Sequence, residues 1–543
     1  EGIKPQTREH LYICELLGVK KGIVVVTKKD LVDEDFLNLQ IEDIKEFVKG
    51  TFLENSRIIP VSSITGEGLQ DFIKELERLA NELTEKPSDK PFRLPIDDIV
   101  TIKGFGTVVR GTIISGTISV KDEIVILPAN YRSRIRSMQS HNQNVTTGYA
   151  GERIALNLPE VEKEEIERGM LVAKEGYFDS TDKLLVELFY LPYNQKPLKS
   201  RFVSQFHIYT RRVEGEFFLI NRDKLNPGEK SYAIIRLKKP VYASYGDPFI
   251  VRGFGVYTTI GGGRIINPSL LSVNRNLSEE YINKIASANP IELIELFLKD
   301  RGKEGIELKK LCGILNFSEE EVKKNIELLL GKNQIFKDLK ERYYHSFVIE
   351  EMKKFILDSV ADFHKKNPLK IGINKSELFE KTSVNEGLFE LILNLLNNDK
   401  KIDISGNIVK SSDFKSNESV KDPLFIKVEK FYLNSELQPE DNFVELSKKT
   451  GINEKALKDI IVSLAKEGIL IKIKDNFYLH RKVFDDMKAK ILNHFSKKDL
   501  LTPQDMKEMF NISRKYTIPI LEYLDSIKFT IRLQEGRKLR SKV

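Results

Sequence analysis

The 543-residue chain contains no tryptophan and only two cysteines, Cys14 and Cys312, which lie far apart. Two distant thiols form neither a disulfide framework nor a zinc site, and this scarcity fits a reducing compartment, so we expect a cytoplasmic protein. The seven histidines form no HxH or HExxH cluster, so we expect no metal site in this chain. No apolar run approaches the roughly 20 residues that cross a bilayer, so no membrane span is expected.

The composition predicts several domains, because 543 residues are too many for one hydrophobic core. Residues 1–87 alternate helix-like and strand-like segments, which predicts a parallel sheet covered by helices. The following region is rich in short β-runs and turn glycines, which favours two small β-barrels at residues 88–175 and 176–272. Beyond it, Leu, Lys, Glu and Ile dominate at helical spacing.

A weak internal repeat occupies this helical part of the chain. Helical segments end in short β-like pairs that close at His345, Lys410, His480 and Arg540. Helices followed by a hairpin are the outline of a winged helix-turn-helix. We therefore expect four tandem winged helices, at residues 273–345, 346–412, 413–482 and 483–543. The alternative is a single irregular helical domain.

The stretch IVVVTKKDLVD is a run of β-formers that ends at Thr27, Lys28, Lys29 and Asp30. Side chains at the carboxyl end of a parallel strand face the crevice in which α/β sheets bind ligands. A carboxylate such as Asp30 accepts two parallel hydrogen bonds, and guanine offers two adjacent donors where adenine does not. The methylene stem of Lys28 would cover one face of the base. Taken alone, the segment is more typical of the start of a solvated helix.

A second strand ends in VSSITGEG, with Ser62 and Ser63 at its tip, where a backbone amide can donate to guanine O6. An [NT]KxD motif followed by a strand ending in S-[AS] resembles the base-recognition half of translational GTPases. This resemblance implies GTP as the ligand, together with Mg²⁺ at its phosphates.

Longer segments extend the resemblance to the EF-Tu superfamily. EGIKPQTREHL resembles the segment after its switch region; GERIALNL and TIKGFGTVVRGTIISGTI resemble its second domain, and DPFIVRGFGVYTTIGGGRIINP its third. The threonine of TKKD, the helical extension and the tail SRKYTIPILEYLDSIKFTIRLQEGRKLR resemble bacterial selenocysteine-specific elongation factors, the SelB family. That family has three EF-Tu-like domains followed by four winged helices. The resemblance implies a GTP-dependent factor that carries selenocysteinyl-tRNA to the ribosome at UGA codons and binds the SECIS hairpin of mRNA.

The phosphate-binding motif GxxxxGK[ST] occurs nowhere in the chain. In the resembling proteins this P-loop, the γ-phosphate sensor and the histidine that positions water precede the segment found at Glu1. We therefore expect residues 1–87 to be the C-terminal half of a GTPase domain, poorly stable alone, in an incomplete sequence. No catalytic residue is identified in this chain, and GTPase activity is expected of the full-length factor.

The resemblance places Arg153, in GERIALNL, in the pocket for the selenocysteinyl group. A selenol is ionised at neutral pH whereas a serine hydroxyl is not, so a guanidinium would favour the correct cargo. His141, in MQSHNQN, is a second candidate for this pocket. Where the family has an arginine before the first barrel strand, this chain has Asp97 and Asp98, which would weaken selenolate binding. The alternative is that Arg153 is structural.

Positive charge is concentrated at the C-terminal end. Between Asn511 and Val543 eight basic side chains face three acidic ones, a net charge of +5, while the whole chain carries +7. Cations at the start of a recognition helix and on a wing would contact RNA phosphates, and an aromatic ring would stack on a base. The candidates are Arg514, Lys515, Tyr516, Arg532, Arg537, Lys538 and Arg540. The alternatives are a solvated cationic face and, for Tyr516, a place in the core.

Two other functions remain open at this point. One is another translational GTPase with an unrelated helical extension, and the other is an RNA-binding regulator with a vestigial GTPase domain. For the leading interpretation we expect a monomer whose partners are selenocysteinyl-tRNA, the SECIS hairpin and the ribosome, with no membrane partner.

Overall fold

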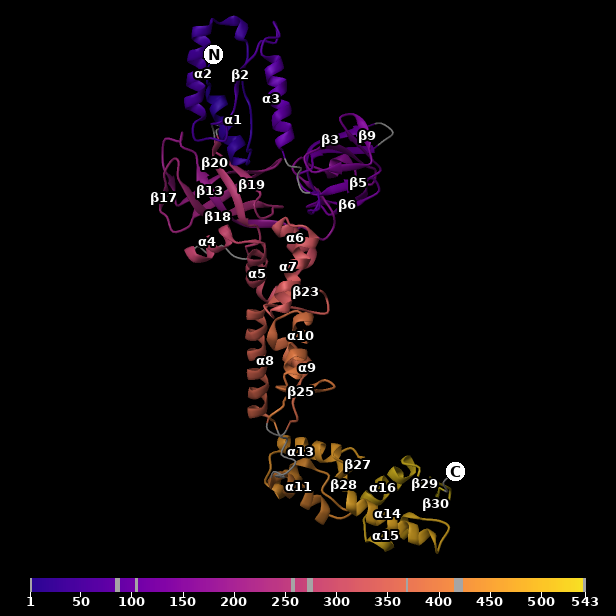
Figure 1. The fold of residues 1–543 in the computed structure, drawn as a ribbon. Helices are drawn as coiled ribbons and strands as arrows, with labels where there is room; N and C mark the ends of the chain where they lie inside the picture. Colours follow the sequence, from indigo (N-terminus) through magenta and orange to yellow (C-terminus); the bar gives the residue numbers. More distant parts are fainter. Residues whose placement is uncertain are drawn as a thin grey trace. The chain divides into compact units, whose positions relative to one another are not determined.

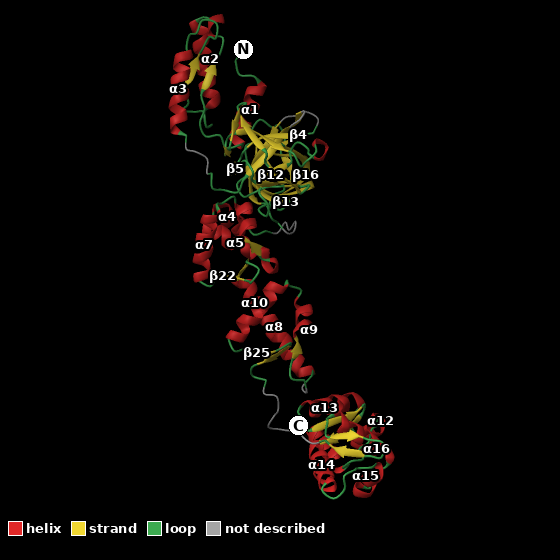
Figure 2. Cartoon of the chain, turned by 90° about the vertical axis from the view of Figure 1, so that its right-hand side faces the viewer, coloured by secondary structure: helices red, strands yellow, loops and turns green. Residues whose placement is uncertain are grey.

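The computed structural model of the protein describes residues 2–83, 88–102, 106–254, 259–270, 277–367, 370–414 and 423–540. These residues form two compact units, Glu1–Met352 with Val384–Ile392, and Lys353–Ser383 with Leu393–Val543. Figure 1 colours the elements by sequence position and Figure 2 by type. The domain boundaries expected at 87/88 and 272/273 fall at or beside residues outside these ranges. In the described part of the chain, no helix is both long and apolar enough to cross a bilayer.

The first region pairs two short strands with three helices, which are α1 (Pro5–Leu16), β1 (Val24–Val26), α2 (Glu34–Val48), β2 (Ile58–Pro60) and α3 (Leu69–Glu82). Strands β1 and β2 are parallel, with Val24 opposite Ile58 and Val26 opposite Pro60. The predicted parallel pairing is therefore confirmed. Because the strands run in the same direction, the segments that follow β1 and β2 leave the same edge of the sheet.

The second region is β-rich, as predicted, but only part of the two-barrel prediction holds. Its strands are hydrogen-bonded in the order β7-β6-β12-β3-β4-β11-β8-β9, beside a separate β10–β5 pair. Among the described residues, the strands at the two ends of this order, β7 and β9, do not pair with each other, so the sheet does not close into a barrel. The bounds are β3 Arg93–Ile102, β4 Gly106–Thr112, β5 Thr117–Ser119, β6 Glu123–Leu127, β7 Tyr131–Arg134, β8 Ser137–Ser140, β9 Gln143–Val145, β10 Thr147–Tyr149, β11 Arg153–Leu158 and β12 Leu171–Ala173.

The third region is a closed barrel of six strands in the order β13-β18-β16-β15-β19-β20. Its interior contains buried aromatic rings, among them Phe206 and Phe249, whose centroids lie 5.3 Å apart. The bounds are β13 Thr181–Tyr190, β15 Arg201–Ile208, β16 Arg211–Leu219, β18 Lys230–Val241, β19 Pro248–Arg252 and β20 Thr259–Asn267, with the pair β14 Leu198–Lys199 and β17 Lys224–Leu225 outside.

Helix α1 packs on this barrel. The Glu9 carboxylate accepts hydrogen bonds from the Thr259 N–H at 2.9 Å, from the Thr259 hydroxyl at 2.8 Å and from Arg252 at 3.1 Å. These contacts fix the helix of the first region to the edge of β20.

The first helical segment shares one hydrophobic core with the barrel. Leu185 and Phe218 of the barrel belong to the same buried cluster as Phe297 and Leu311 of the helices. Gly313 lies so close to the barrel connection that a Cβ atom there would be 1.9 Å from the Tyr177 carbonyl oxygen. The elements are α4 Glu279–Ser287, α5 Pro290–Arg301, β21 Ile306–Glu307, α6 Leu308–Leu315, α7 Glu319–Gly331, β22 Ile335–Lys337 and β23 Arg342–His345.

Three further stretches of helices end in antiparallel hairpins, β25–β26, β27–β28 and β29–β30, near the positions that the repeat predicts. The two-residue strands β21 and β24, which add a third strand to two of the sheets, were not predicted. The exact domain boundaries stay a prediction. The bounds are α8 Ser346–Lys366, β24 Ile373–Asn374, α9 Lys375–Thr382, α10 Glu386–Asn398, β25 Ile402–Ser405, β26 Ile408–Ser411, α11 Pro423–Asn434, α12 Phe443–Thr450, α13 Glu454–Lys466, β27 Leu470–Lys474, β28 Phe477–His480, α14 Arg481–Phe495, α15 Pro503–Phe510, α16 Arg514–Ser526, β29 Thr530–Arg532 and β30 Arg537–Leu539.

Candidate functional site

The segments after β1 and β2 are tied together by their backbones. The Val61 N–H donates to the Val26 carbonyl at 2.8 Å, and the Lys29 N–H donates to the Val61 carbonyl at 3.2 Å. Lys28 adopts a left-handed conformation with φ of 62°, which starts the short turn Lys29–Leu31. The structure thus brings the two halves of the predicted base site to one edge of the sheet.

The side chains of this edge are open to solvent. Thr27, Lys28 and Asp30 are exposed, and the Asp30 carboxylate has no hydrogen-bond or ion-pair partner among the described residues. The neighbouring Lys29 is half-buried and forms an ion pair with Glu67, which joins the two segments through their side chains. Asp30 is therefore available to a ligand, while Lys29 is used internally.

The two serines at the tip of β2 have different roles. Ser62 is buried; its hydroxyl accepts from the Ile64 and Thr65 N–H groups at 3.2 Å, and its own N–H donates to Glu67. Ser63 is exposed, and its N–H makes no hydrogen bond within the described ranges. Ser62 thus shapes the turn, and Ser63 is the residue whose amide remains available to a base.

The start of α3 depends on a glycine. Gly68 has φ of +76°, and a Cβ atom there would lie 2.0 Å from the Pro60 carbonyl oxygen. Only glycine combines this conformation with such a close approach. The turn from Ser62 to Gly68 is therefore fixed at both of its ends beside the candidate base-binding edge.

The candidate cargo pocket lies on β11 and its neighbours. Arg153 binds Asp97 with two parallel hydrogen bonds, from Nε at 3.2 Å and from Nη2 at 2.8 Å, and its side chain is 55% exposed. Ser140 is opposite Ile154, so His141 and Arg153 are adjacent at the end of the β8–β11 pair. The Ser140 hydroxyl lies 3.1 Å from His141 Nδ1. The two predicted pocket residues are therefore neighbours, and Asp97 holds the arginine in place.

At the start of α16, Arg514 and Lys515 are exposed and Tyr516 is half-buried. Lys515 forms an ion pair with Asp441 at 2.7 Å. The Tyr516 ring packs edge-on against Phe477 of the preceding hairpin, with centroids 5.6 Å apart. This contact agrees with the alternative that Tyr516 belongs to the core.

The wing of the last hairpin has both exposed and internal cations. Arg532, Lys538 and Arg540 are exposed. Arg537, which the sequence analysis places among the RNA contacts, is instead 7% exposed, and its Nε donates to Asp525 at 2.8 Å. The pairing joins residues 12 positions apart across the fold, which sequence spacing alone does not reveal. Arg537 therefore stabilises the wing.

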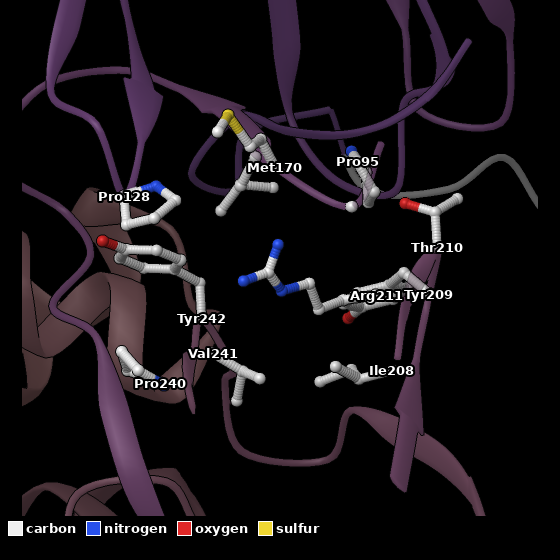
Figure 3. Close-up of a pocket in the computed structure, with 12 residues that line it drawn as sticks. Pro95, Pro128, Met170, Ile208, Tyr209, Thr210, Arg211, Pro240, Val241 and Tyr242 are labelled. Carbon is white, nitrogen blue, oxygen red and sulfur yellow. The ribbon is translucent and has the colours of Figure 1, made fainter. Parts of the chain in front are cut away.

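A small cavity lies between the second region and the barrel (Figure 3). Its wall includes Pro95 and Met170 on one side and Tyr209, Arg211 and Tyr242 on the other, with the Arg211 guanidinium pointing into the space. Its volume of about 20 Å³ is close to that of one water molecule. The cavity is thus too small for a nucleotide or an amino acid. Within the described ranges, no cluster of His, Cys, Asp and Glu is placed to hold a metal ion.

A buried ion pair that sequence reasoning missed lies beside this cavity. Arg93 Nη1 donates to Asp247 at 2.7 Å and to the Ser244 hydroxyl at 3.0 Å. Burial, the largest single effect, lowers the pKa of Arg93, but the charges of Asp247 and Tyr209 and the hydrogen bonds to both together outweigh it and raise this pKa. The pair joins the start of β3 to the barrel.

A parallel α/β edge, a β-domain, a closed barrel and helix-hairpin units in this order define the domain arrangement of an elongation factor of the EF-Tu class with a helical extension. The family model "Elongation factor Tu GTP binding domain" matches residues 1–82, and "Elongation factor Tu domain 2" matches 106–173. The model for the β-barrel domain of the selenocysteine-specific elongation factor matches 186–270, and two "Elongation factor SelB, winged helix" models match 357–410 and 493–539.

Relatives agree over the whole chain. The selenocysteine-specific elongation factor of Desulfomicrobium baculatum is 32% identical across 100% of this chain and 86% of its own length. That of Escherichia coli is 25% identical across 99% and 85%. The crystal structure of a bacterial selenocysteine-specific elongation factor EF-Sec superposes with a TM-score of 0.67 at 26% identity, over 99% of this chain and 84% of that one. The chain belongs to the selenocysteine-specific elongation factor family.

The matches also exclude one of the alternative functions, a translational GTPase with an unrelated helical extension. Because two SelB winged-helix models match within the C-terminal half, this extension is part of the family and not an unrelated addition.

Proposed function

We propose that this chain carries selenocysteinyl-tRNA to the ribosome at UGA codons in a GTP-dependent manner and is guided by the SECIS hairpin of mRNA. The observation that carries the proposal is the similarity of the whole of this chain to selenocysteine-specific elongation factors, which extends from residues 1–82 to the winged-helix tail. A factor with these partners works in the cytoplasm.

For the nucleotide, we assign the guanine base to the edge after β1 and β2. Asp30 accepts from guanine N1 and the 2-amino group, the Ser63 amide donates to O6, and the stem of Lys28 covers one face. Thr27 follows the strand directly, and Ser62 shapes the turn. On this proposal, residues 1–82 supply the contacts to the guanine base.

The phosphates are not assigned to any residue of this chain, because GxxxxGK[ST] does not occur in it. When bound, Mg²⁺ would neutralise charge on the phosphates, and no described residue is assigned to it. The described residues therefore support recognition of the base, and none of them is assigned to hydrolysis.

For the cargo, we propose that Arg153, together with His141, receives the selenocysteinyl group. The Arg153 guanidinium is fixed by Asp97 through two of its five N–H donors, which leaves donors for an anion. An ionised selenol gains from this charge, whereas the neutral hydroxyl of a seryl group does not.

For the mRNA, we propose that the last winged helix binds the SECIS hairpin through Arg514, Lys515, Arg532, Lys538 and Arg540, with Tyr516 and Arg537 supporting them from within. Four of these cations lie on an exposed surface with no acidic partner among the described residues, and phosphates attract such a surface. Holding the cargo and the hairpin in one chain raises the effective concentration of the tRNA near the UGA codon.

The test is a set of binding measurements on the full chain. Filter binding should give a clear preference for a SECIS-type hairpin over a shuffled hairpin of equal length and composition. Guanine nucleotides should compete with a fluorescent GDP analogue at least tenfold better than adenine nucleotides, and Asp30→Asn should remove that difference. A chain that binds the hairpin but discriminates neither nucleotides nor aminoacyl-tRNAs would instead be an RNA-binding regulator.

A further inference from the structure

A second arginine stands next to the candidate cargo pocket. Arg110, on β4, donates from Nη1 to Asp98 at 3.2 Å, and its side chain is 39% exposed. Asp98 also accepts from the Ile99 N–H at 3.0 Å. The sequence analysis did not single out Arg110, because the arginine expected from the family pattern lies on the neighbouring strand.

A β-bulge in β3 explains why both aspartates face this arginine pair. Ile96 is opposite Gly111 and Asp98 is opposite Arg110, so Asp97 is an extra residue in β3. Ile96 is buried and Ile99 packs against the same core. The consecutive side chains of Asp97 and Asp98 consequently both point away from the core.

A glycine permits this bulge. A Cβ atom on Gly111 would lie 2.3 Å from the Pro95 carbonyl oxygen, so β3 and β4 approach each other there more closely than other residues allow. The placement of the two carboxylates is therefore built into the backbone.

The register of β4 and β11 puts the two arginines on one face. Thr112 is opposite Arg153 and Arg110 is opposite Ala155, so Arg110 and Arg153 are diagonal neighbours across the pair. Diagonal neighbours on one face of a sheet lie within reach of long side chains. Arg110 and Arg153 thus flank the same patch of surface.

The four side chains balance in charge. Two guanidinium groups and two carboxylates sum to zero, so Asp98 does not leave the pocket negative as its position alone suggests. Each guanidinium has five N–H donors; Arg153 uses two and Arg110 one in the hydrogen bonds described. Both retain donors for an incoming anion.

We propose that Arg110 is a second specificity-determining cation of the candidate cargo pocket, which supplies positive charge from β4 opposite Asp98. This inference rests on the proposed function. The ligand class is an anionic aminoacyl side chain, the selenolate, which the N–H groups of Arg110 and Arg153 bind together. Asp98 holds Arg110 in the empty pocket and competes with the cargo for it.

The test compares the affinities of the full chain, with GTP present, for selenocysteinyl-tRNA and seryl-tRNA. Arg110→Gln should reduce the preference for selenocysteinyl-tRNA roughly five- to tenfold with little change for seryl-tRNA. Asp98→Asn should increase the preference, because it removes the competing carboxylate. The preference of the unaltered chain should fall as acid protonates the selenol, and Arg110→Gln should flatten this pH dependence.

The matched control is Arg134→Gln, since Arg134 is an exposed arginine of the same β-domain that pairs with Glu123 at 2.8 Å. It should leave both affinities unchanged. If Arg110→Gln leaves both affinities unchanged, as the control does, the inference is wrong. It is also wrong if Asp98→Asn lowers the preference for selenocysteinyl-tRNA as much as Arg110→Gln does, because Arg110 would then be only a structural partner of Asp98. If the unaltered chain has no preference, the proposed function fails and this inference with it.

Discussion

The second helix of the first helix-turn-helix and that of the last begin in opposite ways. Helix α7 starts with Glu319, Glu320 and Glu321, whereas α16 starts with Arg514 and Lys515. Acidic side chains stabilise a helix N-terminus and basic ones oppose its dipole, each by about 0.3–1 kcal/mol. The start of α7 thus favours its own stability, and that of α16 costs stability in exchange for a surface that attracts polyanions.

The two helices also differ in their neighbours, since α7 and the helix before it contact the barrel whereas the start of α16 is exposed. Glu319 accepts a hydrogen bond from the Tyr177 hydroxyl, and the Tyr245 N–H donates to the carbonyl of Ile314, at the end of α6, at 2.7 Å. The first helix-turn-helix is therefore fixed to the barrel. The last one exposes Arg514, together with three cations of its wing. One fold thus serves as a structural support at one place and as a candidate RNA surface at another.

The largest effect on stability is expected from a substitution that forces the first helix-turn-helix away from the barrel. Gly313→Leu places side-chain atoms where a Cβ already meets the Tyr177 carbonyl oxygen at 1.9 Å, and should lower the free energy of unfolding by about 3 kcal/mol. Urea unfolding of the full chain measures this change. The control is Gly331→Ala, which meets nothing within 4 Å and should change stability by less than about 1 kcal/mol. Equal effects of the two variants would mean that the barrel contact is unimportant.

The next test removes the charges of the last wing. Replacing Arg532, Lys538 and Arg540 together by Gln should weaken SECIS hairpin binding about 30-fold and reduce the slope of log affinity against log salt by about 2. Filter binding at several salt concentrations measures both. The double variant Lys323→Gln with Lys324→Gln, on α7, should leave binding unchanged. A similar loss from the α7 variant would contradict the division of roles.

A third test concerns the Asp505 carboxylate, at the start of α15, and its contribution to the stability of the last helix-turn-helix. Burial alone would raise the pKa of Asp505, but hydrogen bonds from Thr502 and Lys498 outweigh it and lower the pKa to about 2. Because the folded pKa lies below the unfolded value of about 3.9, the ionised group stabilises the fold above pH 4, by about 2 kcal/mol. This contribution is lost as pH falls from about 4 to 2.

Asp505→Asn should therefore be less stable than the unaltered chain at pH 7, and the difference should vanish near pH 2. Unfolding monitored by circular dichroism at pH 7, 4 and 2.5 measures it. Asp499→Asn, at an exposed position nearby, serves as the control. A stability difference that is constant with pH would exclude the ionised carboxylate as the cause.

The smallest effect on stability is expected from the hydrogen bond between the Tyr177 hydroxyl and Glu319, which joins α7 to the segment before the barrel. Tyr177→Phe removes the donor to Glu319 and should cost about 1 kcal/mol, measured in the same urea experiment. Tyr131→Phe, for which no hydrogen bond of the hydroxyl is described, should cost less. No difference between the two variants would show that apolar packing alone holds α7 on the barrel.

The sequence was sufficient for features that depend on neighbouring residues. The parallel pairing of β1 and β2, which places Asp30 and Ser63 at one edge of the sheet, agrees with the sequence, because a β-run, a turn and a second β-run dictate where these residues emerge; their binding of a base stays a prediction. The hairpins β22–β23, β25–β26, β27–β28 and β29–β30 followed from alternation and spacing in the same way.

Features that depend on pairing across the fold escaped prediction. The burial of Arg537 requires Asp525 beside it, and the occupied amide of Ser62 requires the turn to close at Glu67. Arg110 escaped because its relation to Arg153 follows from strand register, which residue spacing does not specify. The extra residue in β3 has the same origin, since a bulge is visible only when two strands are aligned.

The bulge at Asp97 bears on how related chains should be compared. Asp97 and Asp98 stand where the resemblance leads us to expect an arginine. On our proposal, Arg110, which is opposite Asp98 on the neighbouring strand, supplies the cation of the candidate cargo pocket instead. A comparison of related chains should therefore consider this strand pair together, because a change at one position can be compensated at the position opposite it.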